Sequence, residues 1–500
     1  MRKVSFTIFA LYISLLALSS RLRGQEISAT IVDSVSQKPI SFATIYLSNN
    51  KGVVSNEEGQ FRISYDLTSK KNDSLFISCM GYKKLGFPIS QFKDSIIYLP
   101  PTSIALNSII LSNNTLTAGQ IIKQIKQDIP SKYELGYTKK KLFFRQSGRQ
   151  KFIKLNVKIK KSSITEFKQI FWDSTLRKIP RKADWHNEIL GNLYGNFSKD
   201  NQKLELEKAL ELEDKKATAI FKNIERLFDT ILKENVKTNS YFKIRTGILG
   251  TKIDADKIVD SEGQDTLSII QKDSIKKNSF LKSRKRILTN IIQYFENEKL
   301  NLFILNKSKK YSFKITDFTY FGETPVYIIS FTPDGNADYK GKIYVDADQM
   351  TLIRLEYKNI QNIRDFSLLG LSFKETLKEV IIQFKKMKSG KYTIQYLEYV
   401  SGSDSMIKRP LVITEKNKIV KGRNKQNQLK MDLDMSNRLY QKYQMVVFET
   451  TPISKLEFET FKEESIILPI NLNQYDPTFW QGYNIIEPNA AIKGFKTKVD

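Results

Sequence analysis

A glycine-bracketed turn constrains the fold of this chain more than any other sequence feature. Gly52 and Gly59 lie on either side of a short run whose centre, residues 56–58, is polar. Glycine tolerates the positive φ that tight turns require, so the pattern predicts positive φ at Gly59. Phe61 and Ile63 then alternate with polar residues, which is typical of a half-buried strand. The segment therefore predicts a strand that follows directly from the turn.

Similar apolar segments recur on both sides of this turn. They cover residues 40–47, 75–80 and 96–99, and Gly81 and Tyr82 follow the second of them. Several short strands at near-regular spacing, separated by Gly, Pro and Asn, are typical of a β-sandwich. The sequence therefore predicts a sandwich over residues 26–112.

The order and spacing of these segments resemble the carboxypeptidase-regulatory-like domain, which also occurs at the N-terminus of many Bacteroidetes TonB-dependent receptors. The matching segments are Ile31-Val32-Asp33, Lys38-Pro39-Ile40, Gly52 with Glu58-Gly59-Gln60-Phe61, Gly81-Tyr82 and Ile109-Ile110-Leu111. Ala29 departs from the family, which usually has glycine there. The resemblance implies a transthyretin-like sandwich that is an accessory module rather than a catalytic one. It gives Gly52, Gly59, Phe61, Gly81 and Tyr82 structural roles.

The N-terminus has the pattern of a secretory signal peptide. Arg2 and Lys3 precede the apolar stretch Val4 to Leu18, which is too short to span a bilayer comfortably. We expect residues 1–25 to be removed and the protein to be exported to the periplasm, the outer membrane or the cell surface. The alternative is an uncleaved membrane anchor. A lipoprotein anchor is not expected, because no Cys lies near the cleavage site.

The chain is strongly basic, with a formal net charge of +28. The basic residues are spread along the chain without a nucleic-acid-binding motif, so no nucleic acid partner is expected. In an exported protein this charge favours an envelope protein, a glycan or an anionic amphiphile as the partner, with association at the outer membrane as an option. The alternative interpretation is a lysine-rich, solvated surface without a partner.

Cysteine and histidine usage argues against the common catalytic chemistries. Cys79 is the only cysteine and His186 the only histidine. A zinc peptidase needs several clustered His and carboxylate ligands, and a Ser-His-Asp triad would depend on His186 alone. We therefore expect no enzyme activity, no metal and no cofactor. A carboxylate-based glycan hydrolase needs only Asp and Glu, so it stays open as an alternative.

Helical and strand patterns both occur behind a polar linker at residues 112–117. Thr117 and Gln120 form a capping-box pattern that predicts a helix ending at Pro130. Apolar residues at helical spacing predict further helices in 204–235 and 281–296, the second starting with the basic cluster 282–286. Residues 143–146 and 152–159 are predicted strands, and 236–280 mainly loops.

From Leu302 to Val400 the pattern predicts six antiparallel strands. They cover residues 311–315, 326–331, 341–346, 352–357, 380–384 and 392–399. Within this region, Tyr339 to Glu356 resembles a lipoprotein-carrier-like half-barrel. That resemblance implies a curved sheet wrapped by helices, whose concave face would suit an apolar or amphiphilic ligand. Whether the face is open or packed shut by the helices remains undecided at this point.

The C-terminal segment 476–488 is rich in aromatic residues. Trp480 and Tyr483 are candidate binding residues, because aromatic faces suit a saccharide or a partner protein. The alternative is that the segment docks onto the core.

Together these patterns predict a mainly β protein, with an N-terminal transthyretin-like β-sandwich followed by an α+β domain that contains a curved antiparallel sheet. The expected division is 1–25 signal peptide, 26–112 sandwich and 118–500 envelope domain. The expected function is non-catalytic binding or assembly in the bacterial cell envelope. The alternatives are a small outer-membrane β-barrel or receptor-like protein, and the glycan hydrolase.

Overall fold

The computed structural model describes residues 25–48, 52–65, 73–93, 95–102, 116–196, 201–237, 239–247, 249–255, 269–292, 295–296, 299–300, 302–420, 422 and 424–496. Residues 1–24 of the predicted signal peptide and 112–115 of the predicted linker lie outside this part. The protein is mainly β and carries an N-terminal β domain, which confirms the predicted fold class.

Two compact units make up the chain. Unit 1 comprises Met1–Ile109, Phe318–Val326 and Asp476–Lys493, and unit 2 comprises Ile110–Asp317, Tyr327–Tyr475 and Gly494–Asp500. This division differs from the expected one, because a hairpin tip and the aromatic C-terminal segment belong with the N-terminal sandwich rather than with the second domain.

Unit 1 contains two small sheets, in the orders β4-β1-β7 and β3-β2-β5-β6. Its strands are β1 (Gln25–Asp33), β2 (Thr44–Leu47), β3 (Gly52–Val54), β4 (Gln60–Tyr65), β5 (Ser74–Ser78), β6 (Leu85–Pro88) and β7 (Ile96–Leu99), with the 3-10 turn η1 (Ile89–Gln91). Inward positions such as Ile31, Ile45 and Ile63 are fully buried. The predicted alternation therefore packs one face of each sheet into a closed core.

The aromatic C-terminal segment packs against this sandwich. Glu487 forms an ion pair with Arg62 (2.9 Å), and Asn484 accepts a hydrogen bond from the Ser64 amide (2.9 Å). The side chain of Trp480 is only 1% exposed. Unit 1 is therefore assembled from the two ends of the chain.

Unit 2 is built on a 14-stranded sheet among the described residues, with the main order β15-β16-β17-β18-β20-β21-β22-β8-β9-β10-β23. Its strands are β8 (Thr138–Ser162), β9 (Lys182–Gly195), β10 (Gln202–Glu213), β11 (Ser240–Thr246), β12 (Leu249–Asp254), β15 (Tyr311–Phe321), β16 (Thr324–Pro333), β17 (Tyr339–Asp346), β18 (Thr351–Asn359), β19 (Arg364–Leu368), β20 (Leu371–Lys386), β21 (Tyr392–Asn417), β22 (Lys425–Pro452) and β23 (Ile470–Leu472); β13 (Phe295–Glu296) and β14 (Lys299–Leu300) pair separately.

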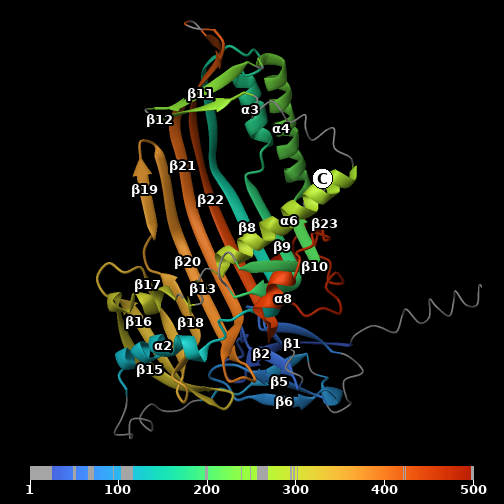
Figure 1. The fold of residues 1–500 in the computed structure, drawn as a ribbon, viewed down its shortest axis with the longest axis vertical. Coiled ribbons are helices and arrows are strands. Elements are labelled where there is room, and N and C mark those ends of the chain that lie inside the picture. The colour runs from blue at the N-terminus through green and yellow to red at the C-terminus, as the bar shows by residue number, and fades with distance from the viewer. Residues whose placement is uncertain are drawn as a thin grey trace, which may run out of the picture. The chain divides into compact units, whose positions relative to one another are not determined.

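Four neighbouring strands are far longer than the rest. The strands β20, β21, β22 and β8 have 16, 26, 28 and 25 residues and run side by side (Figure 1). Strands in globular proteins usually have about 3–10 residues. At about 3.3 Å per residue, β21 extends over roughly 85 Å. The six strands predicted between 302 and 400 are all present, and the last two continue into these long strands.

The helices in the described residues are α2 (Ala118–Lys132), α3 (Gln169–Lys178), α4 (Lys215–Asn235), α6 (Ile269–Ile291), α7 (Phe303–Asn306), α8 (Lys455–Thr460) and α9 (Ala490–Lys493), with the 3-10 turn η4 (Ser308–Lys310). The predicted capping box of Thr117 and Gln120 is present, although α2 continues two residues past Pro130. No helix in the described part of the chain is both long and apolar enough to cross a membrane.

Two predicted helices are wrong in extent. Residues 202–213 form β10 rather than the first part of a helix, and α4 starts only at Lys215. A β-bulge between Leu206 and Lys208 interrupts the apolar–polar alternation of β10, which weakens the local strand signal. The second helix, α6, begins at Ile269, within the region predicted as loops.

Candidate ligand-binding surface

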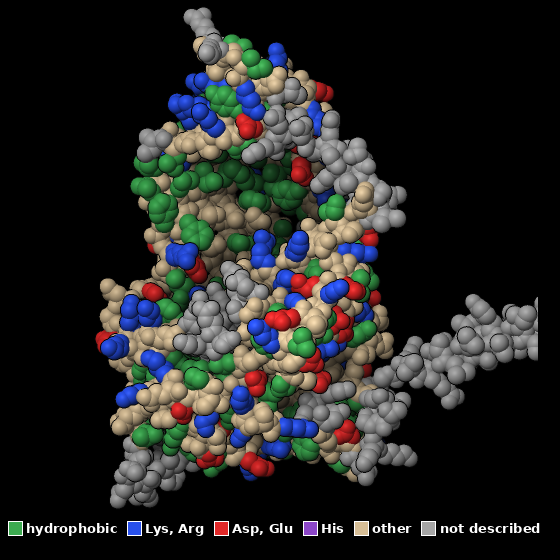
Figure 2. Space-filling model, viewed as in Figure 1, with side chains coloured by type: hydrophobic (Ala, Val, Ile, Leu, Met, Phe, Trp, Pro, Cys, Tyr) green, Lys and Arg blue, Asp and Glu red, His purple; other side chains and the backbone are tan. Residues whose placement is uncertain are grey.

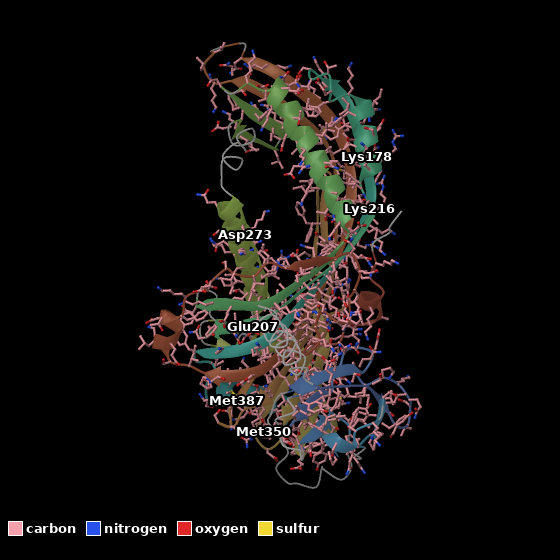
Figure 3. All side chains as sticks on the ribbon, turned by 90° about the vertical axis from the view of Figure 1, so that its right-hand side faces the viewer. Lys178, Glu207, Lys216, Asp273, Met350 and Met387 are labelled. Carbon is pink, nitrogen blue, oxygen red and sulfur yellow. The ribbon has the colours of Figure 1, made fainter. Side chains whose placement is uncertain are left out.

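Unit 2 carries a hollow lined largely by hydrophobic side chains. Figure 2 shows this hollow in the upper half of the view, over the region that Figure 1 assigns to the long strands. In Figure 3, Lys178 lies at the end of α3 and Lys216 at the start of α4, and Asp273 lies on α6 slightly lower in the view. The hollow thus lies on the sheet between two sets of helices.

Strict alternation in β22 gives the sheet an apolar and a polar face. Leu429, Met431, Leu433 and Met435 point to the face that carries α3 and α4, which we call the inner face. Asp432 and Asp434, between them, point to the opposite, outer face. There Asp432 pairs with Lys160 (3.1 Å) and Asp434 with Lys154. The outer face is therefore charged and solvated, whereas the inner face is apolar.

The register of the neighbouring strands extends the inner face sideways. Residues directly opposite each other in an antiparallel pair share a face. The inner-face partners of β22 are Leu155, Val157 and Ile159 on β8, and Ile407, Leu411 and Ile413 on β21. Leu371 and Phe373 continue the face on β20, and Leu368 and Phe366 continue it on β19. The result is an apolar surface five strands wide.

An aromatic cluster closes one end of the inner face. Phe167, Phe171, Trp172 and Phe228 have ring centroids 5.4 to 6.1 Å apart, in tilted and edge-on arrangements that aromatic rings favour. They pack with Ile231 against the floor of β8 and β22. The helices α3 and α4 are thereby fixed to the far end of the long strands.

Two apolar side chains of α4 are exposed, although others on the same helix are buried. Asp214 caps the helix by accepting hydrogen bonds from the Lys216 and Ala217 amides. Ile231, in the second half, is 5% exposed, whereas Phe221 and Leu227 are 41% and 43% exposed. These two side chains add to the apolar surface that unit 2 exposes.

The helix α6 closes the other end. Leu281, Leu288 and Ile292 along α6 and just past its end are buried, and Arg284 between them donates a hydrogen bond to Gln146 of β8 (3.2 Å). Lys285 forms an ion pair with Glu463 (2.6 Å). The basic cluster 282–286 therefore lies inside a helix and is partly ion-paired, rather than forming a solvated helix start. Among the described residues, the inner face is packed at both ends and open between them.

The five residues assigned structural roles lie in unit 1 and hold its turns and core. Gly59 has a φ of +73°, and a Cβ there would lie 2.4 Å from the Ile31 carbonyl oxygen; one at Gly52 would lie 2.6 Å from the Ile45 carbonyl oxygen. The Phe61 side chain is fully buried. These positions tolerate little beyond the residues present.

Gly81 and Tyr82 occupy the other predicted turn. Gly81 has a φ of +83°, and its amide donates a hydrogen bond to the Tyr320 carbonyl (3.1 Å). The Tyr82 hydroxyl donates to Asp33 (2.9 Å), and burial together with this carboxylate raises the pKa of Tyr82 to about 12. None of the five residues borders the hollow, which lies in unit 2.

The two candidate aromatic residues have different surroundings. Trp480 is buried against the edges of Phe479 and Tyr483, with ring centroids 4.9 and 6.2 Å away. Tyr483 is 38% exposed. The buried indole of Trp480 offers no free face to a ligand, so its placement agrees with docking of the segment.

His186 has the surroundings of a structural residue. It is buried on β9, and its Nδ1 lies 2.8 Å from the Ser147 hydroxyl. Burial, with a smaller contribution from Arg145, lowers the pKa of His186 to about 4. Within the described ranges, no cluster of three or more His, Cys, Asp or Glu residues could hold a metal ion.

Two buried lysines lie outside the hollow. Lys140 is near the start of β8, and Lys385 is near the end of β20. Burial lowers the pKa of Lys140 to about 7 and that of Lys385 to about 8. Lys140 donates a hydrogen bond to the Thr138 hydroxyl, and Lys385 donates to the Phe448 carbonyl (2.8 Å). Both ammonium groups are thus hydrogen-bonded within the unit.

Sequence reasoning missed most of the hollow. No strand was predicted between 400 and 452, although β21 and β22 supply the centre of the floor. A local signal was present, because residues 429–435 alternate strictly between apolar and polar. The exposure of Phe221 and Leu227 on α4 had no such signal, because the exposure of a side chain depends on what packs against it.

Comparisons with known proteins add one domain assignment. No curated protein matches the chain. The complex of Pseudomonas aeruginosa MucA and MucB matches at 7% identity and a TM-score of 0.17, covering 65% of this chain and 93% of that chain. MucB in complex with MucA(peri) matches at 6% identity and a TM-score of 0.16, covering 64% and 93%. Scores this low support no structural argument. Residues 27–111 match the family model of the CarboxypepD_reg-like domain, so the N-terminal sandwich is a CarboxypepD_reg-like domain.

Proposed function

We propose that this protein is an exported, non-catalytic binding protein of the cell envelope that holds an apolar or amphiphilic ligand in the hollow of unit 2. One observation carries the proposal. The apolar inner face of the long strands, on which Phe373 and Ile407 are 39% and 41% exposed, forms the floor of a hollow lined largely by hydrophobic side chains (Figure 2). Soluble proteins rarely expose contiguous apolar surface beyond a few hundred Å², and larger patches mark binding sites.

Burial of this surface would supply the binding energy. Removing apolar surface from water contributes about 2.5 kcal/mol per 100 Å². An alkyl chain in the hollow would cover inner-face residues of the sheet, so its own surface and theirs would be buried together. Such a contact is largely insensitive to the polar end of the ligand.

Export and the absence of catalysis are parts of the proposal that rest on the sequence and the site. Residues 1–25 have the pattern of a signal peptide. The sole histidine is buried away from the hollow, and the apolar floor carries no paired carboxylates in the described strands. We therefore propose binding without turnover, in the periplasm or at the outer membrane.

The proposal is tested by titrating the purified protein with dodecyl maltoside below its critical micelle concentration, using calorimetry. Met435→Lys places a charge on the inner face, and Met406→Lys makes the same change on the outer face of the adjacent strand. We expect Met435→Lys to weaken binding at least tenfold and Met406→Lys to change it less than twofold.

Two results would contradict the proposal. Absence of saturable binding, or equal weakening by the two variants, would show that the inner face is not the binding surface. Hydrolysis of an envelope glycan or peptide by the purified protein would contradict the non-catalytic part alone.

A further inference from the structure

One charged residue interrupts the apolar floor of the hollow. On β21, Ile407, Arg409, Leu411 and Ile413 occupy successive inner-face positions, and Arg409 lies directly opposite Leu433 of β22. Arg409 is only 5% exposed. A buried guanidinium on an apolar surface is costly unless anionic or carbonyl groups satisfy it.

The structure satisfies little of this guanidinium. Its Nη2 donates one hydrogen bond to the Thr246 carbonyl (2.8 Å), at the end of β11. In the part of the chain that the structure describes, no carboxylate lies within ion-pair distance of Arg409. Glu415, further along β21, uses its two oxygens on the Lys237 amide and the Asn427 side chain. A guanidinium has five N–H donors, and this contact engages one of them.

Two glycine turns make room for this side chain. The turn between β11 and β12 contains Gly247 (φ +61°), where a Cβ would lie 2.5 Å from Nη2 of Arg409. The turn between β19 and β20 contains Gly370 (φ +79°), where a Cβ would lie 3.1 Å from Cγ of Arg409. Each turn places a glycine next to Arg409, where a larger residue would clash with the arginine side chain. The two turns therefore confine that side chain from two sides.

We propose that Arg409 binds the anionic head group of an amphiphile whose alkyl chain lies on the inner face; this deepens the proposed function and rests on it. Arginine presents paired N–H groups that match the two oxygens of a carboxylate or a phosphate. The adjacent inner-face positions Ile407, Leu411 and Leu433 are all apolar, so a chain attached to that head group meets apolar contacts directly.

The same site would discriminate against other head groups. A neutral head group offers this guanidinium no compensating charge, and a cationic head group is repelled by it. Arg284, the cation that α6 brings to the sheet, is a weaker candidate because Gln146 and Glu211 already contact it at 3.2 and 3.6 Å. The geometry therefore favours Arg409 as the head-group anchor.

The test compares ligands that share a dodecyl chain and differ in the head group. Dodecyl phosphate and dodecanoate are the two anionic probes, dodecyl maltoside is the neutral probe and dodecyltrimethylammonium is the cationic probe. We expect both anionic probes, or one of them, to bind at least tenfold more tightly than dodecyl maltoside, and the cationic probe to bind most weakly. The ratio of dodecyl phosphate to dodecanoate affinity distinguishes a phosphate from a carboxylate head group.

Variants at two neighbouring positions complete the test. Arg409→Met should lower the affinity for the preferred anionic probe at least tenfold and should not lower the affinity for dodecyl maltoside. Lys408→Met removes the same charge from the exposed outer face of the same strand and should change neither affinity. Replacing a buried, poorly satisfied cation by an apolar residue is often neutral for stability, so Arg409→Met should fold. Arg409→Lys serves as a second variant that keeps the charge and loses the paired donors, with an intermediate affinity expected.

The possible results separate the two claims. If dodecyl maltoside binds at the inner face but Arg409→Met leaves anionic binding unchanged, the head-group site is wrong and the proposed function stands. Equal loss of anionic binding in Lys408→Met and Arg409→Met would also overturn the head-group site, because it indicates a general charge effect. If none of the four probes binds, the proposed function itself is wrong.

Discussion

The two units use the same alternation of apolar and polar residues with different results. In unit 1, the inward residues of the sandwich are covered from both sides, and Ile31, Ile45 and Ile63 are fully buried. In unit 2, inner-face residues of the same kind remain open, with Phe373 39% and Ile407 41% exposed. Alternation alone therefore does not distinguish a core from a binding surface, and what covers the face decides between them.

Strand length explains why one face is covered and the other is not. The strands of unit 1 have 3 to 9 residues, so two small sheets cover each other along their whole length. The four long strands of unit 2 have 16 to 28 residues, whereas α3, α4 and α6 reach only their ends or their lower part. The uncovered middle follows from this mismatch of lengths.

The largest expected effect is a loss of stability in unit 1, whose apolar faces are covered. Trp480→Ala should lower the free energy of unfolding of unit 1 by about 3–5 kcal/mol, because it removes a fully buried indole. Hydrogen exchange with mass spectrometry should show faster exchange in β1 and β4. The exposed neighbour provides the control, since Tyr483→Ala should cost less than about 1 kcal/mol. Equal effects of the two substitutions would show that the C-terminal segment is not part of the unit 1 core.

A smaller effect is expected on the stability of unit 2 when the pH is lowered. His186 lies in unit 2, and its pKa is about 4 in the folded state compared with about 6.5 when unfolded. Between these values the unfolded state binds the proton and the folded state does not, so stability falls as pH decreases from 6.5 to 4. At about 1.4 kcal/mol per pKa unit, the loss should be about 2–3 kcal/mol.

Carboxylates also titrate in this range, so the prediction is a difference between two proteins. Urea unfolding of unit 2, followed at pH 7 and pH 4, should lose less stability in His186→Gln than in the unsubstituted protein. An identical loss in both would mean that His186 is protonated in the folded state.

Most of the fold of unit 1 and part of that of unit 2 could be predicted from the sequence. The predicted features depend on neighbouring residues, whereas the missed ones depend on contacts between distant parts of the chain. The turn at Gly59, the capping box at Thr117 and the six strands between 302 and 400 depend on local residues, and all of them are present. Docking of residues 476–493 on the sandwich depends on contacts between the two ends of the chain. No local pattern specifies such contacts, so the expected domain boundary missed this segment.

The candidate site shows the same limit. The resemblance predicted a curved sheet with a concave face, whereas the open middle of the inner face depends on what packs against it. Arg409 in particular has no local signal, because in the sequence it is one of two adjacent basic residues, Lys408 and Arg409. Only the register of β21 with β22 places one of them inside the hollow and the other outside.

The most direct test of the account uses the methionines as natural probes of the two faces. Met431 and Met435 lie on the inner face, Met406 lies on the outer face of the neighbouring strand, and Met350 and Met387 lie away from the hollow (Figure 3). Methyl NMR of the methionine-labelled protein, titrated with dodecyl phosphate, should shift the Met431 and Met435 signals and leave those of Met406, Met350 and Met387 in place. Saturable binding of dodecyl phosphate that leaves the Met435 signal in place, or that shifts the Met406 signal instead, would contradict the assignment of the inner face as the ligand-binding surface.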